Sequence, residues 1–426
     1  MRGLQLLPEH DERRRLALHF LSYTTQRGLP VLATFLLARI LGVEDFGFFI
    51  AALTTFSTLT LFADLGVSQA ITTRIGRMIA VNRLGDAGAL TIIASIASVA
   101  VGLLISLLLL LNLQPLEEAV YGNNAAWTHL VPGALYIPAT ALALVLTGAL
   151  TGSRNYRSLA IVGASSGVLY VAIVVGFAFL AESEGALWGA ALGVLVRALL
   201  CAFFVKRDFI GKEHRRTAID VRSEGLQLAA IAIPASIAAF AWTPVNTYLI
   251  ATMFRSPDGA VEVGVFGVTQ QIFSIAMLFP GILTQFSLPR MAVISGDRAR
   301  AQRKKIALQY AIYAGIAALA ISSVALAFPK MVMSLFGAAY ARHDNTLVLM
   351  LLAGVVSAPQ GVFSNYMLAA GMNWMRVTTW IVWAFVVVAA TAIEHDVTAY
   401  EAAHAYLIGW CSLTLLQGYC VLADRR

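Results

Sequence analysis

The sequence predicts an all-α polytopic membrane protein with twelve transmembrane helices in two parallel six-helix lobes around a central cavity. Of its 426 residues, 59% are hydrophobic and only 12% are charged, about half the charged share of soluble proteins. The mean hydropathy is +0.77. So little charge cannot cover a soluble surface. Apolar runs of about 20 residues cross a bilayer as helices and are too long for the strands of an outer-membrane barrel.

The apolar runs define the expected spans in order. The first begins after Arg13, Arg14 and Arg15 and contains no small-residue cleavage site, so we expect a retained helix and not a signal peptide. The twelve spans are expected at residues 16–40, 47–72, 87–111, 127–152, 159–181, 186–206, 225–253, 264–288, 306–328, 346–370, 377–393 and 400–421.

Lysine and arginine fall in alternate loops between these spans. Of the 30, 24 lie on the side of the N-terminus. The other six are Arg255, Lys330 and Arg342 in the opposite loops and Arg27, Arg39 and Arg197 within spans. Because cytoplasmic loops carry the excess of positive charge, we expect a multi-pass protein of the bacterial inner membrane with both termini in the cytoplasm.

Two pairs of similar segments indicate an internal repeat of six helices. Val43-Glu44 through Gly47 resembles Val261-Glu262 through Gly264, about 218 residues later. Residues 152–157 likewise resemble residues 371–376, about 219 residues later. Six spans separate the members of each pair, so the halves are expected to be parallel repeats related by an axis along the membrane normal.

The expected domain organisation follows from the spans and the repeat. The longest loop is too short for a soluble domain. We therefore expect a cytoplasmic arm (1–15), an N-lobe of spans one to six (16–206), a cytoplasmic linker (207–224), a C-lobe of spans seven to twelve (225–421) and a cytoplasmic tail (422–426).

The opening of the chain resembles a known family. Residues 36–48 read LLARILGVEDFGF and residues 64–70 read DLGVSQA. These segments are similar to the start of the oligosaccharide flippases of bacterial polysaccharide export, in the multidrug, oligosaccharidyl-lipid and polysaccharide exporter superfamily. The resemblance implies a V-shaped cavity lined largely by spans one, two, seven and eight, and transport by alternating access.

The resemblance also implies a substrate and partners. The substrate would be a polyprenyl-diphosphate-linked oligosaccharide, flipped from the cytoplasmic to the periplasmic leaflet for cell-surface polysaccharide biosynthesis. Membrane lipids and a counter-ion, either a proton or sodium, would be the other partners. We expect a monomer that binds no nucleic acid and needs no cofactor.

Polar residues inside the spans are the candidate substrate-binding residues, because lipid cannot be what they face. Tyr23, Gln26 and Arg27 belong to one polar stripe on span one. Asp64 lies on span two and Arg197 on span six, at about the same depth as Arg27. Spans seven and eight contribute Asn246 and Gln270.

Two interpretations of the charged residues remain open. Arg27 and Asp64 could form a buried ion pair that only locks neighbouring helices. Alternatively, Arg27 and Arg197 bind the diphosphate, since a guanidinium offers a planar fork of donors that matches phosphate oxygens. Asp64 is then either a static partner or a carboxylate whose protonation couples transport to a proton gradient.

Metal binding and enzymatic chemistry are not expected. Glu401 and His404 have the spacing of a metal-binding pair, but Thr398 and Glu401 form a capping box at the start of the last span. Cys201, Cys411 and Cys420 lie in apolar runs and indicate no disulfide. No catalytic motif is present. The alternatives to a flippase are a multidrug or cation antiporter of the same superfamily and, less favoured, a membrane polysaccharide polymerase.

Overall fold

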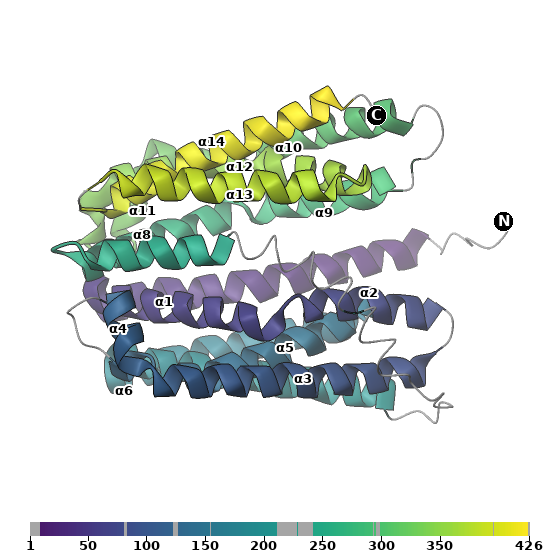
Figure 1. Cartoon of the computed structure of the whole chain (residues 1–426), viewed down its shortest axis with the longest axis horizontal. Coiled ribbons are helices and arrows are strands. Elements are labelled where there is room, and N and C mark those ends of the chain that lie inside the picture. The colour runs from purple at the N-terminus through teal and green to yellow at the C-terminus, as the bar shows by residue number, and fades with distance from the viewer. Residues whose placement is uncertain are drawn as a thin grey trace. The chain divides into compact units, whose positions relative to one another are not determined.

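The computed structural model describes residues 9–80, 83–121, 127–153, 155–210, 228, 242–292, 294, 299–394 and 396–424. For residues 9–24, 26–27, 80, 84, 127, 210, 289 and 292 it describes the backbone alone. These parts of the chain are helices joined by short turns (Figure 1). Nine of the described helices are long and apolar enough to cross a membrane.

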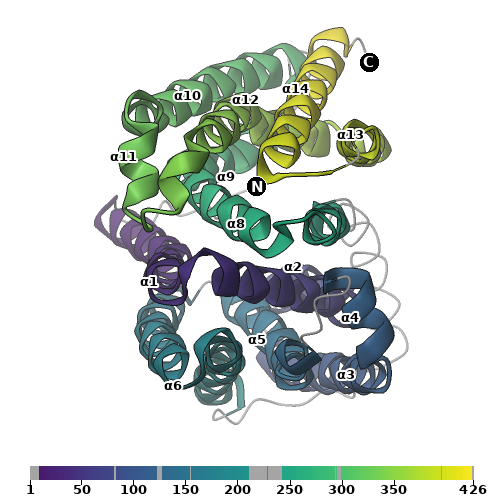
Figure 2. The ribbon, with the colours of Figure 1, turned by 90° about the vertical axis from the view of Figure 1, so that its left-hand side faces the viewer.

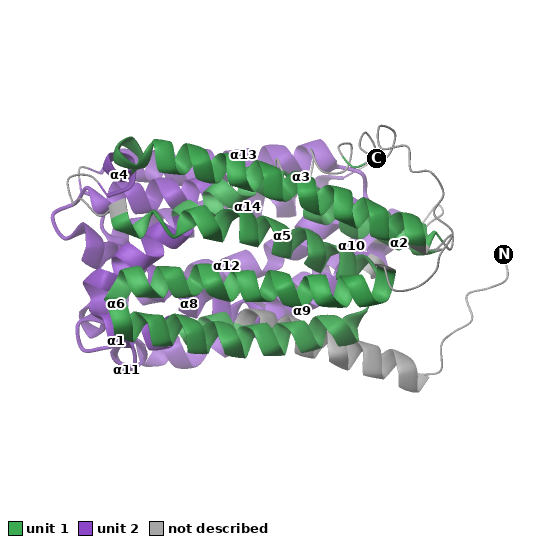
Figure 3. Cartoon of the chain, turned by 90° about the horizontal axis from the view of Figure 1, so that it is seen from below, with its two compact units in different colours: residues 1–33, 55–116, 126–236 green, residues 34–54, 117–125, 237–426 purple. Residues whose placement is uncertain are grey.

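The chain divides into two compact units (Figure 3). Unit 1 comprises Met1–Ala33, Thr55–Leu116 and Ala126–Ser236. Unit 2 comprises Thr34–Thr54, Glu117–Ala125 and Ile237–Arg426. A segment of the first helix therefore packs with the second half of the chain. The lobe boundaries expected from the sequence, 16–206 and 225–421, stay a prediction.

Unit 1 is built around apolar side chains shared by four helices. Its core includes Ile71, Leu90, Val145 and Cys201, one from each of these helices. The elements that lie wholly or partly in unit 1 are α1 (Glu9–Asp64), α2 (Val67–Ala80), α3 (Leu84–Leu111), α4 (Leu113–Tyr121), η1 (Trp127–His129), α5 (Gly133–Gly152), α6 (Tyr156–Val205) and η2 (Lys206–Ile210).

Unit 2 packs its helices around a second core, and Figure 2 shows α10, α12 and α14 gathered there. Alanines at positions 307, 311, 314 and 318 repeat along one face of α10 and meet α12 residues such as Val362. Besides the helical residues 242–254, its elements are α8 (Gly259–Ala276), α9 (Leu278–Ala292), α10 (Ala299–Ala327), α11 (Pro329–Ser334), η3 (Tyr340–His343), α12 (Asp344–Ala369), α13 (Asn373–Ala392) and α14 (Ala399–Ala423).

The helices confirm the predicted all-α membrane architecture. Helix α1 is interrupted at Gly42 and α6 at Ala181 and Glu182, where the backbone leaves the helical region. Each of these two helices therefore holds two expected spans, so the nine membrane-length helices account for eleven of the twelve. The seventh expected span, 225–253, lies mostly outside the described residues.

Expected span 47–72 is not one continuous helix, and this is a correction. Helix α1 ends at Asp64 and α2 begins at Val67. Between them Leu65 and Gly66 adopt positive φ values of 41° and 74°. Glycine tolerates that conformation without steric cost, so the Leu65-Gly66 pair allows a turn inside an otherwise apolar run.

The two predicted repeat segments contact each other reciprocally inside unit 2. A Cβ on Gly47 would lie 1.9 Å from the carbonyl oxygen of Ala260, and one on Gly264 would lie 2.1 Å from that of Val43. Gly264 follows Gly47 by 217 residues, and Ala260 follows Val43 by the same number. Only glycine permits this approach. The contact explains why residues 34–54 group with the second half of the chain.

Candidate functional site

A small cavity inside unit 1 contains the predicted site residue Arg197. Its volume is about 190 Å³, and α1, α5 and both arms of α6 line it. The polar lining side chains are Tyr136 from α5 and Ser166, Tyr170 and Arg197 from α6. Pro30 of α1 also borders the cavity. The two arms of α6 meet here because the chain turns back at Ala181 and Glu182.

Arg197 is the charged residue among the described side chains that line this cavity. It acts electrostatically on the hydroxyl group of Tyr136, which also forms a hydrogen bond with the side chain of Ser57. Hydroxyl and guanidinium groups are hydrogen-bond donors, and no carboxylate occurs among the described lining residues. The cavity is therefore suited to an anion.

Asp64 has a local role at the break between α1 and α2. Its Oδ1 accepts a hydrogen bond of 3.1 Å from the backbone N–H of Ser68, and its Oδ2 accepts one of 2.8 Å from the Ser68 hydroxyl. Only 9% of Asp64 is exposed. Within the described side chains, no cation forms an ion pair with it. The carboxylate thus satisfies donors at the start of α2, as an N-terminal cap does.

Three predicted residues lie outside the described side chains. The backbone of Tyr23, Gln26 and Arg27 belongs to α1. The pairing of Arg27 with Asp64 and the polar stripe of span one therefore stay predictions.

Asn246 and Gln270 come together in unit 2, with a partner that the sequence did not reveal. The side-chain amide of Gln270 donates to Asn246 Oδ1 at 2.7 Å and contacts the Tyr406 hydroxyl at 3.3 Å. The Tyr406 hydroxyl in turn donates to Asn246 Oδ1. Asn246 and Tyr406 are buried, whereas Gln270 is half-buried. That Asn246 and Gln270 bind substrate stays a prediction.

An aromatic cluster surrounds this hydrogen-bonded triad. Trp242 stacks on Trp383 with ring centroids 5.4 Å apart, and both contact Tyr406 and Trp410. The indole Nε1 atoms of Trp383 and Trp410 are buried and have no hydrogen-bond partner among the described residues. The close sequence spacing of Trp380 and Trp383 on one helix face was the signal that could have predicted this cluster.

The residues with metal-binding spacing serve the last helix, as predicted. The backbone N–H of Thr398 donates to Glu401 Oε2 at 3.0 Å, and the reciprocal bond of the capping box is present. Glu262 also accepts a hydrogen bond of 2.6 Å from the N–H of Ala399. The described part of the chain holds no group of three or more His, Cys, Asp or Glu residues arranged for a metal.

The apolar helices and their enclosed polar sites define a multi-pass membrane protein. The chain belongs to the polysaccharide biosynthesis protein family, whose model matches residues 13–295. It is 24% identical over 415 residues to the EPS I polysaccharide export inner membrane protein EpsE of Ralstonia nicotianae, covering 93% of this chain and 91% of that one. EpsE of Ralstonia solanacearum is likewise 24% identical over 414 residues, with the same coverage.

Solved structures confirm the fold. An inward-facing multidrug resistance MATE family transporter of the MOP superfamily has a TM-score of 0.77 at 14% identity, with 96% of each chain covered. The eukaryotic MATE transporter AtDTX14 has a TM-score of 0.71 at 14% identity, with 97% of this chain and 96% of that chain covered. The relatives and fold neighbours of this chain are polysaccharide export and MATE proteins, which are transporters and not enzymes, in agreement with the prediction from the sequence.

Proposed function

We propose that this protein flips a polyprenyl-diphosphate-linked oligosaccharide across the inner membrane by alternating access, for cell-surface polysaccharide biosynthesis. The family membership and the export role named for its Ralstonia relatives support a polysaccharide pathway. The MATE-like fold supports a transporter that alternates between two openings.

The observation that supports this proposal most directly is the cavity that Arg197 lines, with no carboxylate among its described lining residues. Sites for drug-sized ligands measure about 300 to 1,000 Å³, whereas this cavity measures about 190 Å³. A sugar repeat unit does not fit, but a phosphate group does. In the proposed mechanism Arg197 holds part of the diphosphate, while the sugars occupy a larger space.

The other predicted residues have proposed roles in the same cycle. Arg27, with Tyr23 and Gln26, binds the second part of the diphosphate as the lipid enters from the cytoplasmic leaflet. Asn246 and Gln270 bind sugar hydroxyls, because amide groups both donate and accept hydrogen bonds. The protein works as a monomer with both termini in the cytoplasm, and a proton or sodium gradient drives it.

Flipping in proteoliposomes tests the proposal. The substrate is a lipid-linked oligosaccharide whose sugars are oxidised by a membrane-impermeant reagent once they reach the outer leaflet. We expect Arg197→Gln to slow flipping by about tenfold or more, because charge-assisted hydrogen bonds to phosphate are lost. Arg197→Lys keeps the charge but loses the planar fork and should be intermediate.

The matched control is Arg255→Gln, which removes an exposed arginine in the turn after residues 242–254. It should flip at the wild-type rate. Normal flipping by Arg197→Gln would remove the cavity from the mechanism. If the wild-type vesicles instead move a cationic dye against a proton gradient and leave the oligosaccharide where it is, the protein is a cation antiporter.

A further inference from the structure

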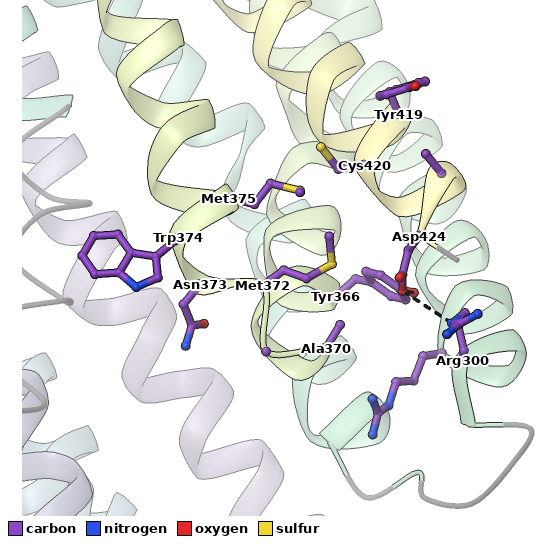
Figure 4. Close-up of a pocket in the computed structure, with 13 residues that line it drawn as sticks. Arg300, Tyr366, Ala370, Met372, Asn373, Trp374, Met375, Tyr419, Cys420 and Asp424 are labelled. Atoms are coloured by element: carbon purple, nitrogen blue, oxygen red, sulfur yellow. Dashed lines mark hydrogen bonds and ion pairs between the residues drawn. The ribbon is translucent and has the colours of Figure 1, made fainter. Parts of the chain in front are cut away.

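A second, larger cavity lies in unit 2 near the end of α14 (Figure 4). Its volume is about 700 Å³. The end of α12, the first turn of α13, the start of α10 and the end of α14 line it. Figure 4 shows Arg300 and Tyr366 directed toward Asp424 on one side of this cavity.

Arg300 is the cation in this cavity with unused hydrogen-bonding capacity. Arg300 forms an ion pair with Asp424, in which its buried Nε atom lies 3.8 Å from Asp424 Oδ2. That distance is beyond hydrogen-bonding distance, and Nε has no hydrogen-bond partner among the described residues. The neighbouring Arg303 donates to the carbonyl oxygens of Met291 and Ile294 at 3.2 and 2.5 Å. Two donors of Arg303 are thus used at the end of α9 and just beyond it. Arg300 makes no described hydrogen bond, and its side chain is 39% exposed, so its guanidinium donors can bind an anion in addition to Asp424.

The start of α13 faces the same cavity without a side-chain cap. Met372 is its N-cap residue and makes no capping hydrogen bond. Residues 373–375, which form the first turn, line the cavity. The first N–H groups of a helix have no partner within the helix and carry a partial positive charge, so they favour an anion.

At the corresponding helix start in unit 1, the first turn of α6, a cap residue binds a carboxylate of the protein's own chain. Asn155 occupies the place of Met372, since each donates its N–H to a carbonyl five residues earlier, at 3.2 and 2.8 Å. Asn155 caps α6 by accepting from the N–H of Ser158 at 3.1 Å. Its amide also donates to the carboxylate of Asp208.

In unit 2 the matching carboxylate is directed elsewhere. Asp424 follows Asp208 by 216 residues, close to the offset of the repeat. It accepts a hydrogen bond of 2.7 Å from the Tyr366 hydroxyl. The start of α13 therefore lacks both the capping side chain and the carboxylate that serve α6 in unit 1.

The rim of the cavity has the chemistry of a membrane interface. Trp374 and Tyr419 line it and are 76% and 69% exposed. Tryptophan and tyrosine concentrate at the level of lipid headgroups, and basic pockets between membrane helices bind anionic headgroups. Met375, also exposed, adds apolar surface beside them. We propose that this cavity binds the phosphate headgroup of an anionic phospholipid, with Arg300 and the first turn of α13 holding the phosphate.

Lipid retention by the purified full-length protein tests this site without reference to transport. The protein is titrated with phosphatidylglycerol or phosphatidylcholine in detergent, and bound lipid is counted by native mass spectrometry. Wild-type protein should retain phosphatidylglycerol preferentially. Arg300→Gln should raise its dissociation constant by about tenfold, the effect of losing a charge-assisted hydrogen bond.

Two further variants separate the site from general surface charge. Lys305→Gln removes an exposed charge from the same end of α10 and should change nothing. Met372→Asn removes no charge but supplies the cap that Asn155 provides in unit 1, so it should weaken phosphatidylglycerol binding by occupying the first-turn N–H groups.

Three results would overturn the proposal. One is equal loss of binding in Arg300→Gln and Lys305→Gln. Another is binding of phosphatidylcholine as tight as that of phosphatidylglycerol. The third is displacement of the lipid by inorganic phosphate at the lipid's own concentration, which would assign the cavity to free phosphate. None of these results bears on Arg197 and flipping.

Discussion

At Asp64 a carboxylate that the sequence places deep in a membrane span meets its hydrogen-bond donors locally. Two of its donors, a backbone N–H and a hydroxyl, come from Ser68, one turn further along the chain. Two such bonds lower the cost of keeping a charge at that depth. We therefore propose a capping role for this side chain in place of a gradient-coupling role.

Substitutions at Asp64 distinguish the two roles. Asp64→Asn keeps an oxygen that can accept from the Ser68 N–H, so thermal stability and the response of transport to a pH gradient should both match wild type. Asp64→Ala loses the cap and should lower the free energy of unfolding by about 1 kcal/mol. Thermal unfolding in detergent and flipping under imposed gradients measure these effects. An Asp64→Asn protein that is stable but insensitive to the gradient would restore the coupling role.

Single residues were predictable from the sequence where placing them inside a membrane span costs much free energy. Arg197 was predicted as a site residue because charged residues within apolar spans are costly and usually functional. In the structure it lines a cavity. Its neighbours Tyr136 and Tyr170 were not predicted, because tyrosine is common in spans and only the fold brings α5 and α6 together. Tyr406 was missed for the same reason.

Among the elements, residues 43–47 and 260–264 make the closest backbone approach at any described glycine of unit 2. Two helix segments meet where each side offers a glycine and a backbone carbonyl. A side chain at either glycine would force the segments apart, since packed interiors have little free volume.

Alanine substitutions test this contact. Gly47→Ala and Gly264→Ala should each destabilise the protein by about 1 to 3 kcal/mol, the range for overpacking. Because both act on one contact, the double variant should cost less than the sum of the two. Gly176→Ala on α6 is the control, since an added Cβ there meets nothing within 4 Å. Stability is measured by thermal unfolding in detergent. A wild-type midpoint for Gly47→Ala would show that the helices can separate freely.

Hydropathy predicted where helices lie but not where they break. The turns at Gly42 and at Glu182 fall between predicted spans, because polar residues mark both places. The turn at Leu65 and Gly66 lies inside an apolar run, where hydropathy gives no information on backbone conformation. Local cues were present, since Asp64 and Gly66 flank Leu65 and both residue types are typical of turns and caps.

For the whole molecule, the distribution of positive charge makes a prediction about orientation. In a background in which Cys201, Cys411 and Cys420 are replaced by serine, a cysteine at Asn345 should react with a membrane-impermeant thiol reagent in intact cells. A cysteine at Gly211 should react only after the membrane is opened, because cytoplasmic loops carry the excess of lysine and arginine. Labelling at Gly211 in intact cells would reverse the proposed topology.

The reciprocal glycine contact suggests how such a chain could have arisen. In a two-fold dimer of six-helix chains, the glycine of one chain would pack against a backbone carbonyl of the second chain. By symmetry, the same glycine of the second chain would pack against the same carbonyl of the first. A single codon would then have specified both halves of the interface. After duplication and fusion placed the two copies in one gene, each codon could change alone. Even so, Gly47 still packs against the segment that contains Gly264, and Gly264 against the segment that contains Gly47. Selection on either position therefore acts on the other, and the two should vary together among descendants.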